Sequence, residues 1–441
     1  MSEKQTKYLI IGNSAGGIGA TEAIREIDEA GSITIVSDEP YPTYSRPLIA
    51  EYLAKRCPLE RMDYRPVDFY ERNNIRTVLG KKAVKLVPDK HLIELDSGEQ
   101  IRWEKLLLAT GGVPIVPPMR GVNTKGVFSF TKLDDARAID EFLTRKKARA
   151  VVIGGGLIGV SVTEALAKRG VKVTIVEMKE RLLNVMLDET ASALEEAALR
   201  QAGVDIITGQ TVAEINGDSA DAVAGVTLDD GQKISCDLVV VAIGVRPRTE
   251  LAAGAGLKVN RGIVVDRQMA TSTPDVYACG DAVEAYDFVW NDCRPTPILP
   301  NAYLGGRVAG FNMAGKTTEY PGGTAMNSLK YFGLNVVSAG LVNPPDPSFE
   351  VLSHNQNGDY RKLVLKDGRV VGMVFAGDIE KAGIVFSLMK NRVDVSHFKP
   401  SLVASDFGLA HLPTELWEPH FKAPETVSNV VEQPEEALVG E

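Results

Sequence analysis

The sequence is poor in cysteine and has no excess of positive charge. Its 441 residues include four cysteines, which form neither a C-x-x-C pair nor a spacing typical of metal ligands. We therefore predict no metal site, and a reducing cytoplasm is the simplest setting for so few cysteines. Lysine and arginine (49) are fewer than aspartate and glutamate (58), and the net charge of −9 argues against nucleic acid or an anionic membrane as a partner.

Long apolar runs and aromatic residues are also scarce. No apolar stretch approaches the ~20 residues of a membrane-spanning helix. The first strand is expected almost at the start of the chain, which leaves no room for a secretory leader. Aromatic residues make up 6% of the chain, whereas glycine is frequent (41), and this composition favours α/β folds with many glycine turns. The length predicts roughly two to four domains.

What the sequence does contain is a dinucleotide-binding signature that begins at residue 151. An apolar run over residues 151–153 stops at GGGLIG, which is G-x-G-x-x-G directly before a helix expected over residues 160–169. Gly154 is expected to form the tight turn, Gly156 to let a pyrophosphate approach the backbone, and Gly159 to let helix and strand pack closely. The phosphates would meet the unpaired N–H groups at the start of the helix.

An acidic residue at the end of the next strand indicates which dinucleotide binds. Residues 171–176 are expected to form this strand, and Glu177 follows it. A carboxylate at this place accepts hydrogen bonds from an adenosine ribose and repels a 2′-phosphate, so the unit is predicted to bind NADH rather than NADPH. The alternative is a βαβ unit whose glycines serve packing alone.

The start of the chain repeats this pattern with one change. A strand over residues 8–11 is followed by GNSAGG, in which Ser14 replaces the middle glycine. A helix over 18–28 and a strand over 33–36 complete the unit. Two dinucleotide folds in one chain predict two different dinucleotides, and a flavin is the natural acceptor for a hydride from a nicotinamide.

Further segments show which family the chain resembles. They are GNSAGG at 12–17, ATGG at 109–112, GGGLIG at 154–159, AIGVRP at 242–247 and STPDVYACGDA at 272–282. In this order they resemble the FAD- and NAD-dependent pyridine nucleotide–disulfide oxidoreductase superfamily, over roughly residues 7–345. The segment DEPYPTYSRPL at 38–48 is similar to the rubredoxin reductase, ferredoxin reductase and apoptosis-inducing-factor branch.

The resemblance implies an α/β fold with two Rossmann-like, three-layer dinucleotide-binding domains and a C-terminal α+β dimerisation domain. The expected bounds are 1–120 and 245–320 for the FAD-binding domain, 121–244 for the NAD-binding domain, 321–420 for the interface domain and 421–441 for a flexible acidic tail. In the NAD-binding domain, Thr131 and Asp134 form a capping-box-like start to a helix over 133–143. A helix expected over 186–202 carries an acidic face that we interpret as solvated: Asp188, Glu189, Glu195 and Glu196.

The C-terminal segment contains short alternating strands. They are expected at 328–332, 335–339, 360–365 and 370–375, with a hairpin turn at 366–369 and a helix over 379–389. The resemblance implies that an aromatic residue of this domain approaches the flavin, with Tyr331 and Phe332 as candidates. Ordinary strand core is the alternative for both residues.

The resemblance also implies the cofactor-binding residues. At the adenosine end of FAD, Asp38 or Glu39 is expected at the ribose and Ala83 facing the adenine, while the pyrophosphate is expected at Gly12, Ser14, Ala15 and Gly16. Arg46 is expected at the flavin or its phosphates, Gly280 and Asp281 at the ribityl chain, and Ala109, Thr110 and Gly111 along the cofactor. Leu299 and Ala302 lie at a helix start whose dipole stabilises negative charge on the reduced flavin. For NAD the expected residues are Gly154, Gly156, Leu157, Ile158, Gly159, Glu177 and Gly244, while Phe332 is expected at the flavin. From the residues alone, Arg46 fits a surface salt bridge and Asp281 fits a turn equally well.

Residues needed for sulfur chemistry are missing. Related disulfide reductases and water-forming oxidases use one or two cysteines beside the flavin, but the chain has Ser45 there, and a serine cannot become a thiolate or sulfenate. Cys57 lies further along the chain. Many relatives also place a Lys–Glu pair beside the flavin, and the matching positions are Glu51 and Ser161. Hydride transfer does not need that pair, so we expect flavin-mediated catalysis with no catalytic side chain.

The predicted function is an FAD-dependent NADH:acceptor oxidoreductase. Its partner is expected to be an iron–sulfur or rubredoxin-type protein, or a sister subunit of a larger complex, with electrons flowing in either direction. The protein itself is expected to be a homodimer or part of such a complex. One alternative is an NADH oxidase that reduces O₂ to peroxide, and another is a non-enzymatic sensor that binds flavin and NADH.

Overall fold

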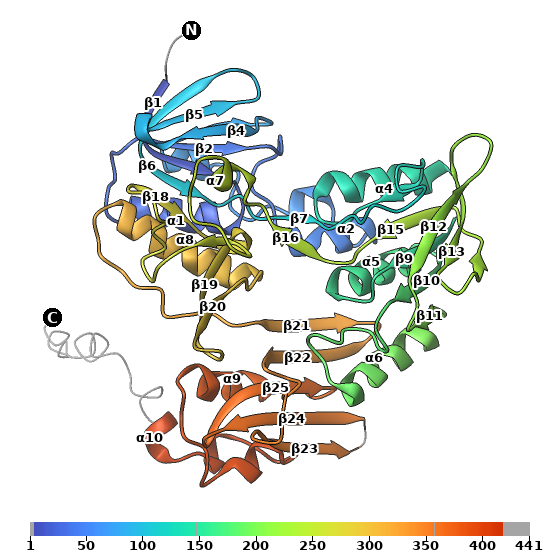
Figure 1. Cartoon of the computed structure of the whole chain (residues 1–441). Helices are drawn as coiled ribbons and strands as arrows, with labels where there is room; N and C mark the ends of the chain where they lie inside the picture. Colours follow the sequence, from blue (N-terminus) through green and yellow to red (C-terminus); the bar gives the residue numbers. More distant parts are fainter. Residues whose placement is uncertain (1–3, 146–147, 357, 418–441) are drawn as a thin grey trace, which may run out of the picture.

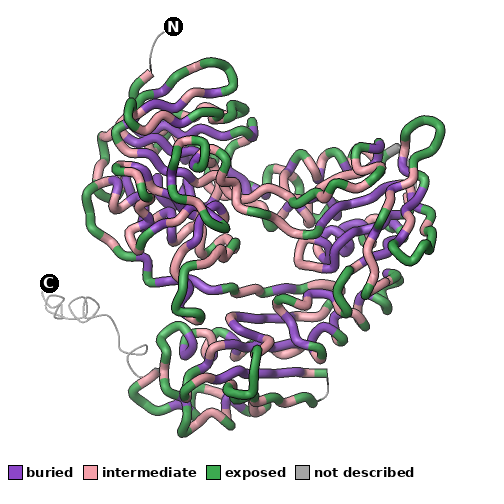
Figure 2. Tube along the Cα trace, in the orientation of Figure 1, coloured by how far each residue is buried: buried purple, intermediate pink, exposed green. Residues whose placement is uncertain are grey.

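The computed structural model of the protein describes residues 4–145, 148–356 and 358–417, so the predicted acidic tail lies outside the described residues. Figure 1 shows three sheet-containing units, of which the first is coloured mainly blue, the second green and the third orange to red. In Figure 2 the central strands of the three sheets are largely buried, whereas the edge strands are partly or mostly exposed. Within the described residues, every helix is too short or too polar to cross a membrane.

The first unit is built on a sheet with the strand order β3-β2-β1-β6-β5-β4, in which β18 also pairs with β6. The parallel strands are β1 (Lys4–Ile11), β2 (Ile33–Ser37), β3 (Ile75–Leu79), β6 (Gln100–Leu108) and β18 (Val276–Ala278), and the antiparallel ones are β4 (Ala83–Val87) and β5 (Leu92–Leu95). Smaller elements are α2 (Ile49–Leu53), α3 (Phe69–Arg72), α7 (Glu250–Gly254), β17 (Ile263–Val264), β19 (Val283–Asp287) and β20 (Asp292–Arg294). Since β18 follows the second unit in sequence, the first unit is completed by two distant segments.

Two helices of the first unit cross in backbone contact. They are α1 (Ala15–Arg25), which begins earlier than predicted because it starts directly after Ser14, and α8 (Leu299–Met313). A Cβ atom on Gly306 would lie 2.0 Å from the carbonyl oxygen of Gly16, and one on Gly310 would lie 2.4 Å from that of Ala20. Only glycine allows this approach. The crossing places the first turn of α8 beside the first turn of α1.

The second unit is a parallel sheet with the order β11-β10-β9-β15-β8. Its strands are β8 (Val127–Phe128), β9 (Arg149–Ile153), β10 (Lys172–Glu177), β11 (Asp205–Thr208) and β15 (Leu238–Val241), and its helices are α4 (Leu133–Arg145), α5 (Leu157–Lys168) and α6 (Glu189–Gln201). A small antiparallel sheet, formed by β12 (Val212–Gly217), β13 (Val223–Leu228) and β14 (Lys233–Ile234), lies beside it. The chain enters this unit through β7 (Gly112–Pro114) and leaves it through β16 (Val245–Pro247), and these two strands pair with each other.

The third unit is an antiparallel sheet with the order β21-β22-β25-β24-β23. Its elements are β21 (Met326–Tyr331), β22 (Leu334–Gly340), β23 (Glu350–Gln356), β24 (Asp359–Lys366), β25 (Arg369–Ala376), α9 (Ala382–Lys390) and α10 (Thr414–Trp417). The predicted turn at 366–369 is confirmed, with Asp367 and Gly368 at positive φ. Strand β23 was not predicted, because this edge strand is mostly exposed and lacks the alternation of a half-buried strand.

Two predictions about helices of the second unit were wrong, one of them in part. At the start of α4, the backbone N–H groups of Thr131 and Lys132 donate to Asp135 at 2.6 and 3.1 Å, so Asp135 rather than Asp134 caps this helix. Of the acidic residues expected to be solvated, Glu195 of α6 is fully buried and Asp188, the N-cap residue of α6, is 8% exposed. Glu189 is exposed and Glu196 is half-buried, so the prediction holds for part of this face alone.

Asp188 is buried because the third unit packs against the start of α6. Asp188 accepts hydrogen bonds from the Tyr360 hydroxyl at 2.5 Å and from the Lys362 ammonium at 3.0 Å, and both donors lie on β24. Leu329 and Val336 of the third unit belong to the same hydrophobic cluster as the buried residues of α5 and α6. The second and third units therefore share one core.

Candidate functional site

One large cavity lies between the three units. Its volume is about 1350 Å³, above the roughly 300–1,000 Å³ of a pocket for one small ligand. It is lined by residues 12–16, which follow β1, and by most of residues 153–158, which follow β9. We name these segments the first turn and the second turn. Both follow the carboxyl ends of parallel strands, where open α/β sheets bind nucleotides, so the cavity has room and two binding edges for two of them.

The glycines of the second turn have the local geometry that the sequence predicts. Gly154 has a φ of +106°, and a Cβ on Gly159 would lie 1.9 Å from the carbonyl oxygen of Gly154, so Gly159 serves helix–strand packing and does not line the cavity. Gly156 lines the cavity, and no atom lies within 4 Å of the place where its Cβ would be. This open space above the start of α5 is what a pyrophosphate needs.

Glu177 is fixed at the end of β10 by backbone donors. Its carboxylate accepts hydrogen bonds from the N–H groups of Gly155 at 2.6 Å and Lys179 at 2.8 Å. Both oxygens keep further lone pairs, and the residue lines the cavity. The position therefore remains suited to ribose hydroxyls.

The first turn has a similar shape although its middle position is serine. Gly12 has a φ of +125°, and a Cβ on it would lie 2.1 Å from the carbonyl oxygen of Ala109. Ser14 is the N-cap residue of α1 in extended conformation, and its side chain makes no capping hydrogen bond. The start of α1 thus faces the cavity, and the Ser14 side chain does not cap its backbone N–H groups.

The two acidic residues after β2 have different surroundings. Both carboxylate oxygens of Glu39 have partners, namely the guanidinium of Arg46 and the hydroxyl of Tyr44, the latter at 2.6 Å. Asp38 pairs with Arg248 at 2.9 Å. Burial alone would raise the pKa of Asp38, but nearby arginine and lysine side chains outweigh it and hold this pKa below its usual value. Of the two residues left open by the sequence, Asp38 is the better candidate for the ribose.

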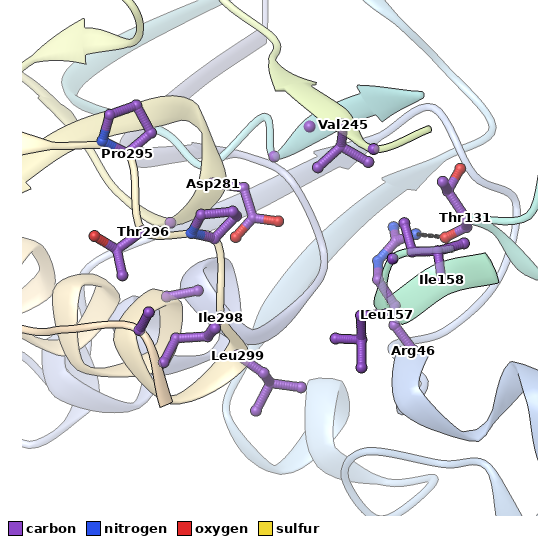
Figure 3. Close-up of a pocket in the computed structure, with 18 of the residues that line it drawn as sticks. Arg46, Thr131, Leu157, Ile158, Val245, Asp281, Pro295, Thr296, Ile298 and Leu299 are labelled. Carbon is purple, nitrogen blue, oxygen red and sulfur yellow. Dashed lines mark hydrogen bonds between the residues drawn. The ribbon is translucent and has the colours of Figure 1, made fainter. Parts of the chain in front are cut away.

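Arg46 and Asp281 lie on opposite sides of the cavity in Figure 3. Leu157 and Ile158 lie on the same side as Arg46, and Leu299 lies on the same side as Asp281. Arg46 also donates to the carbonyl oxygen of Thr131 at 3.2 Å. Burial raises the pKa of Asp281 above its usual value.

The structure brings most of the predicted residues to the cavity, but not all. Those that line it are Gly12, Ser14, Ala15, Gly16, Asp38, Glu39, Arg46, Ala109, Thr110, Gly111, Gly154, Gly156, Leu157, Ile158, Glu177, Gly244, Gly280, Asp281, Leu299 and Ala302. Ala83 lies at the start of β4, and neither it nor Phe332 lines the cavity.

Neither aromatic candidate of the third unit lines the cavity, and both Tyr331 and Phe332 pack against the core shared with the second unit, as the alternative of strand core expects. The hydroxyl of Tyr331 interacts with Ser161, and the N–H of Phe332 donates to Glu164 at 2.9 Å, so the β21–β22 turn lies against α5. Asn327 and Ser338 of the same hairpin line the cavity instead. Sequence reasoning missed them because a strand pattern does not show which of its residues faces a distant domain.

The cysteines offer no sulfur relay. Of the four, all within the described residues, only Cys279 lines the cavity, and burial raises the pKa of its thiol to about 12. Cys57 lies after α2 and does not line the cavity. Glu51, at the place of the missing lysine, instead pairs with Arg56.

Comparison with known proteins identifies the family. Residues 6–299 match the pyridine nucleotide-disulphide oxidoreductase family, and residues 326–393 match the rubredoxin NAD⁺ reductase C-terminal domain. The chain belongs to the pyridine nucleotide-disulphide oxidoreductase family. It is 33% identical over 420 residues to the NADH-dependent phenylglyoxylate dehydrogenase subunit epsilon of Aromatoleum evansii, covering 94% of this chain and 99% of that one.

Two further members of the family share the architecture. The NADH-rubredoxin oxidoreductase of Clostridium acetobutylicum is 29% identical over 376 residues, which is 85% of this chain and 92% of the relative. The crystal structure of a covalent putidaredoxin reductase–putidaredoxin complex superposes with a TM-score of 0.84 at 25% identity, covering 94% of this chain and 98% of that one. The predicted family, fold class, oxidoreductase activity and FAD and NADH cofactors are confirmed.

Proposed function

We propose that the protein moves electrons between NADH and an iron–sulfur or rubredoxin-type protein, or a sister subunit that carries such a centre. One observation supports this most strongly: both nucleotide-binding turns open into the same cavity, and its one cysteine is a buried thiol of high pKa. Bound FAD would supply the chemistry, since a flavin accepts a hydride and can release electrons singly. The chain's own residues then need only to bind, orient and discriminate.

We assign these tasks to the residues that line the cavity. The second turn and the start of α5 hold the pyrophosphate of NADH, and Glu177 selects against a 2′-phosphate. The first turn holds the pyrophosphate of FAD, and Asp38 the ribose of its adenosine. The N-terminal end of α8, at Leu299 and Ala302, would direct the positive end of the helix dipole at the flavin ring. No side chain has to act as acid or base.

The acceptor is the part of the proposal that experiment must decide. Anaerobic holoenzyme should reduce rubredoxin or a [2Fe–2S] ferredoxin with NADH, followed by the absorbance of the iron protein. Peroxide formation and coenzyme A disulfide reduction serve as comparison reactions. Disulfide reduction that is lost in Cys57→Ser, or stoichiometric peroxide at a higher turnover than any iron protein supports, would contradict the proposal.

We also propose the setting and organisation of the protein. The few cysteines and the absence of a membrane-spanning helix among the described residues support a cytoplasmic protein. We further propose that it forms a homodimer through the third unit or joins a larger complex, and sedimentation of the purified holoenzyme tests this. The domain bounds stay as the sequence predicts them: 1–120 with 245–320, 121–244, and 321–420.

A further inference from the structure

Strand β21 runs from the first unit, to which we assign FAD, to the second unit, to which we assign NADH. Just before its start, Gly323 forms a bridge with Asp287 of the first unit, and the Thr324 hydroxyl donates to Asp287 at 3.1 Å. At its other end, Tyr331 interacts with Ser161 of α5 in the second unit. In Figure 1 this strand runs from beside β20 to below α5. Its middle therefore lies between the two units, and hydride transfer requires a nicotinamide bound to one unit to contact a flavin bound to the other.

One face of β21 and β22 changes character along this path. Leu329 pairs with Val336, and both pack into the core shared with the second unit. One step closer to the first unit, Asn327 pairs with Ser338, and both line the cavity. Directly opposed residues of an antiparallel pair share a face with their Cβ atoms about 4.5–5.5 Å apart. The face thus presents an amide and a hydroxyl side by side where its apolar part ends.

These two polar groups have no partner in the described protein. Ser338 is only 2% exposed, and its buried hydroxyl makes no hydrogen bond within the described residues. Within the part of the chain that the structure describes, the half-buried Asn327 side chain has no hydrogen-bond partner either. Buried polar groups in native proteins are nearly always paired, so the Ser338 hydroxyl calls for a partner that the protein alone does not supply. The half-buried Asn327 places its amide beside this hydroxyl.

We infer that Asn327 and Ser338 bind the carboxamide of nicotinamide and so help to select NADH as the hydride donor. A carboxamide carries one acceptor oxygen and an NH₂ donor, and the asparagine side chain offers the complementary pair in the same plane. The Ser338 hydroxyl adds a donor or acceptor beside it. The inference rests on the proposed binding of NADH at the second turn and extends it to residues of the third unit.

An analogue of NADH tests the inference. Reduced 3-acetylpyridine adenine dinucleotide has a methyl ketone in place of the amide and so lacks the two N–H donors. Holoenzyme would be assayed with each donor and ferricyanide as acceptor. In Asn327→Leu, kcat/KM for NADH should fall on the order of tenfold, as expected for a lost hydrogen bond, while the analogue loses less. The preference for NADH over the analogue should therefore be smaller in the variant than in the wild type, and the intrinsic reactivities of the two donors cancel when these two preferences are compared.

A second variant, a control and a binding measurement complete the test. Ser338→Ala removes no hydrogen bond within the protein, so it should fold normally and shift the preference in the same direction. Ser328→Ala, at the exposed neighbouring position, should leave the preference unchanged. Titration calorimetry of NAD⁺, without turnover, should show a Kd raised about tenfold in Asn327→Leu.

Unchanged preference and unchanged Kd in both cavity variants would overturn the inference. Equal losses for both donors would do so as well, since they would indicate a general structural effect. Ferricyanide bypasses any protein acceptor, so a failure to reduce iron–sulfur proteins would count against the proposed function and leave this result intact.

Discussion

Glu195 provides a quantitative prediction about stability. The residue lies on α6 with no exposed surface, and neither carboxylate oxygen has a hydrogen-bond partner in the described protein. Burial, with the carboxylate of Glu164 as a second cause, raises the pKa of Glu195 from 4.5 to about 8. The folded protein therefore holds this side chain as the neutral acid, whereas the unfolded chain ionises it near its ordinary pKa.

The sign of the effect follows from proton linkage. Between pH 4.5 and 8 the folded state binds the proton and the unfolded state releases it, so rising pH favours unfolding. Below pH 4.5 both states are protonated and the penalty vanishes. A difference of about 3.5 pKa units corresponds to at most about 5 kcal/mol, and between pH 5 and pH 8 the change is about 3 kcal/mol.

The substitution Glu195→Gln isolates this contribution, because glutamine has the same shape and does not ionise. The stability gap between the variant and the wild type should grow by about 3 kcal/mol from pH 5 to pH 8, with the variant gaining relative to the wild type. Urea unfolding of the holoprotein at several pH values, followed by far-UV circular dichroism, measures the gap.

Glu189→Gln is the matched control, since Glu189 lies on the same helix but is exposed. Its gap to the wild type should stay nearly constant with pH. A gap for Glu195→Gln that is independent of pH, or that closes as pH rises, would refute the assignment of a buried neutral carboxyl group.

Three other predictions concern the nucleotide site. Gly156→Ala should fold normally but raise the Kd for NADH at least about tenfold, because its methyl group fills the space open to the pyrophosphate. Gly159→Ala should instead lower the stability by about 1–3 kcal/mol, because its methyl group clashes with Gly154. Calorimetry measures the first effect and thermal unfolding the second, and equal Kd values for wild type and Gly156→Ala would contradict this account. Glu177→Ala should lower the preference for NADH over NADPH about tenfold or more in stopped-flow flavin reduction, since it removes a like charge from the 2′-phosphate, and an enzyme that already prefers NADPH would disprove the assigned role. Cys57→Ser should leave kcat/KM for NADH unchanged, and a marked loss would reveal a thiol step.

The sequence alone determined the local backbone and the pair of cofactors. The glycine spacing at residues 154–159 requires a tight turn, an open approach and a close helix contact at fixed offsets, and the structure shows all three. The acidic residue that ends β10 lies a fixed distance along the chain from this turn. Such features depend on neighbours within one βαβ unit, so their geometry follows from the order of residues.

The tertiary structure decided which faces meet across domains. The sequence shows that α6 has an acidic face, but only the packing of α6 near Glu164 of α5 and Tyr331 of the third unit makes Glu195 a buried group instead of a solvated one. In the same way, the hairpin pattern of β21 and β22 does not show that Asn327 and Ser338 reach the cavity while Phe332 turns to α5. These contacts join residues more than a hundred positions apart, and a periodic pattern within one element carries no information about the surface that covers it.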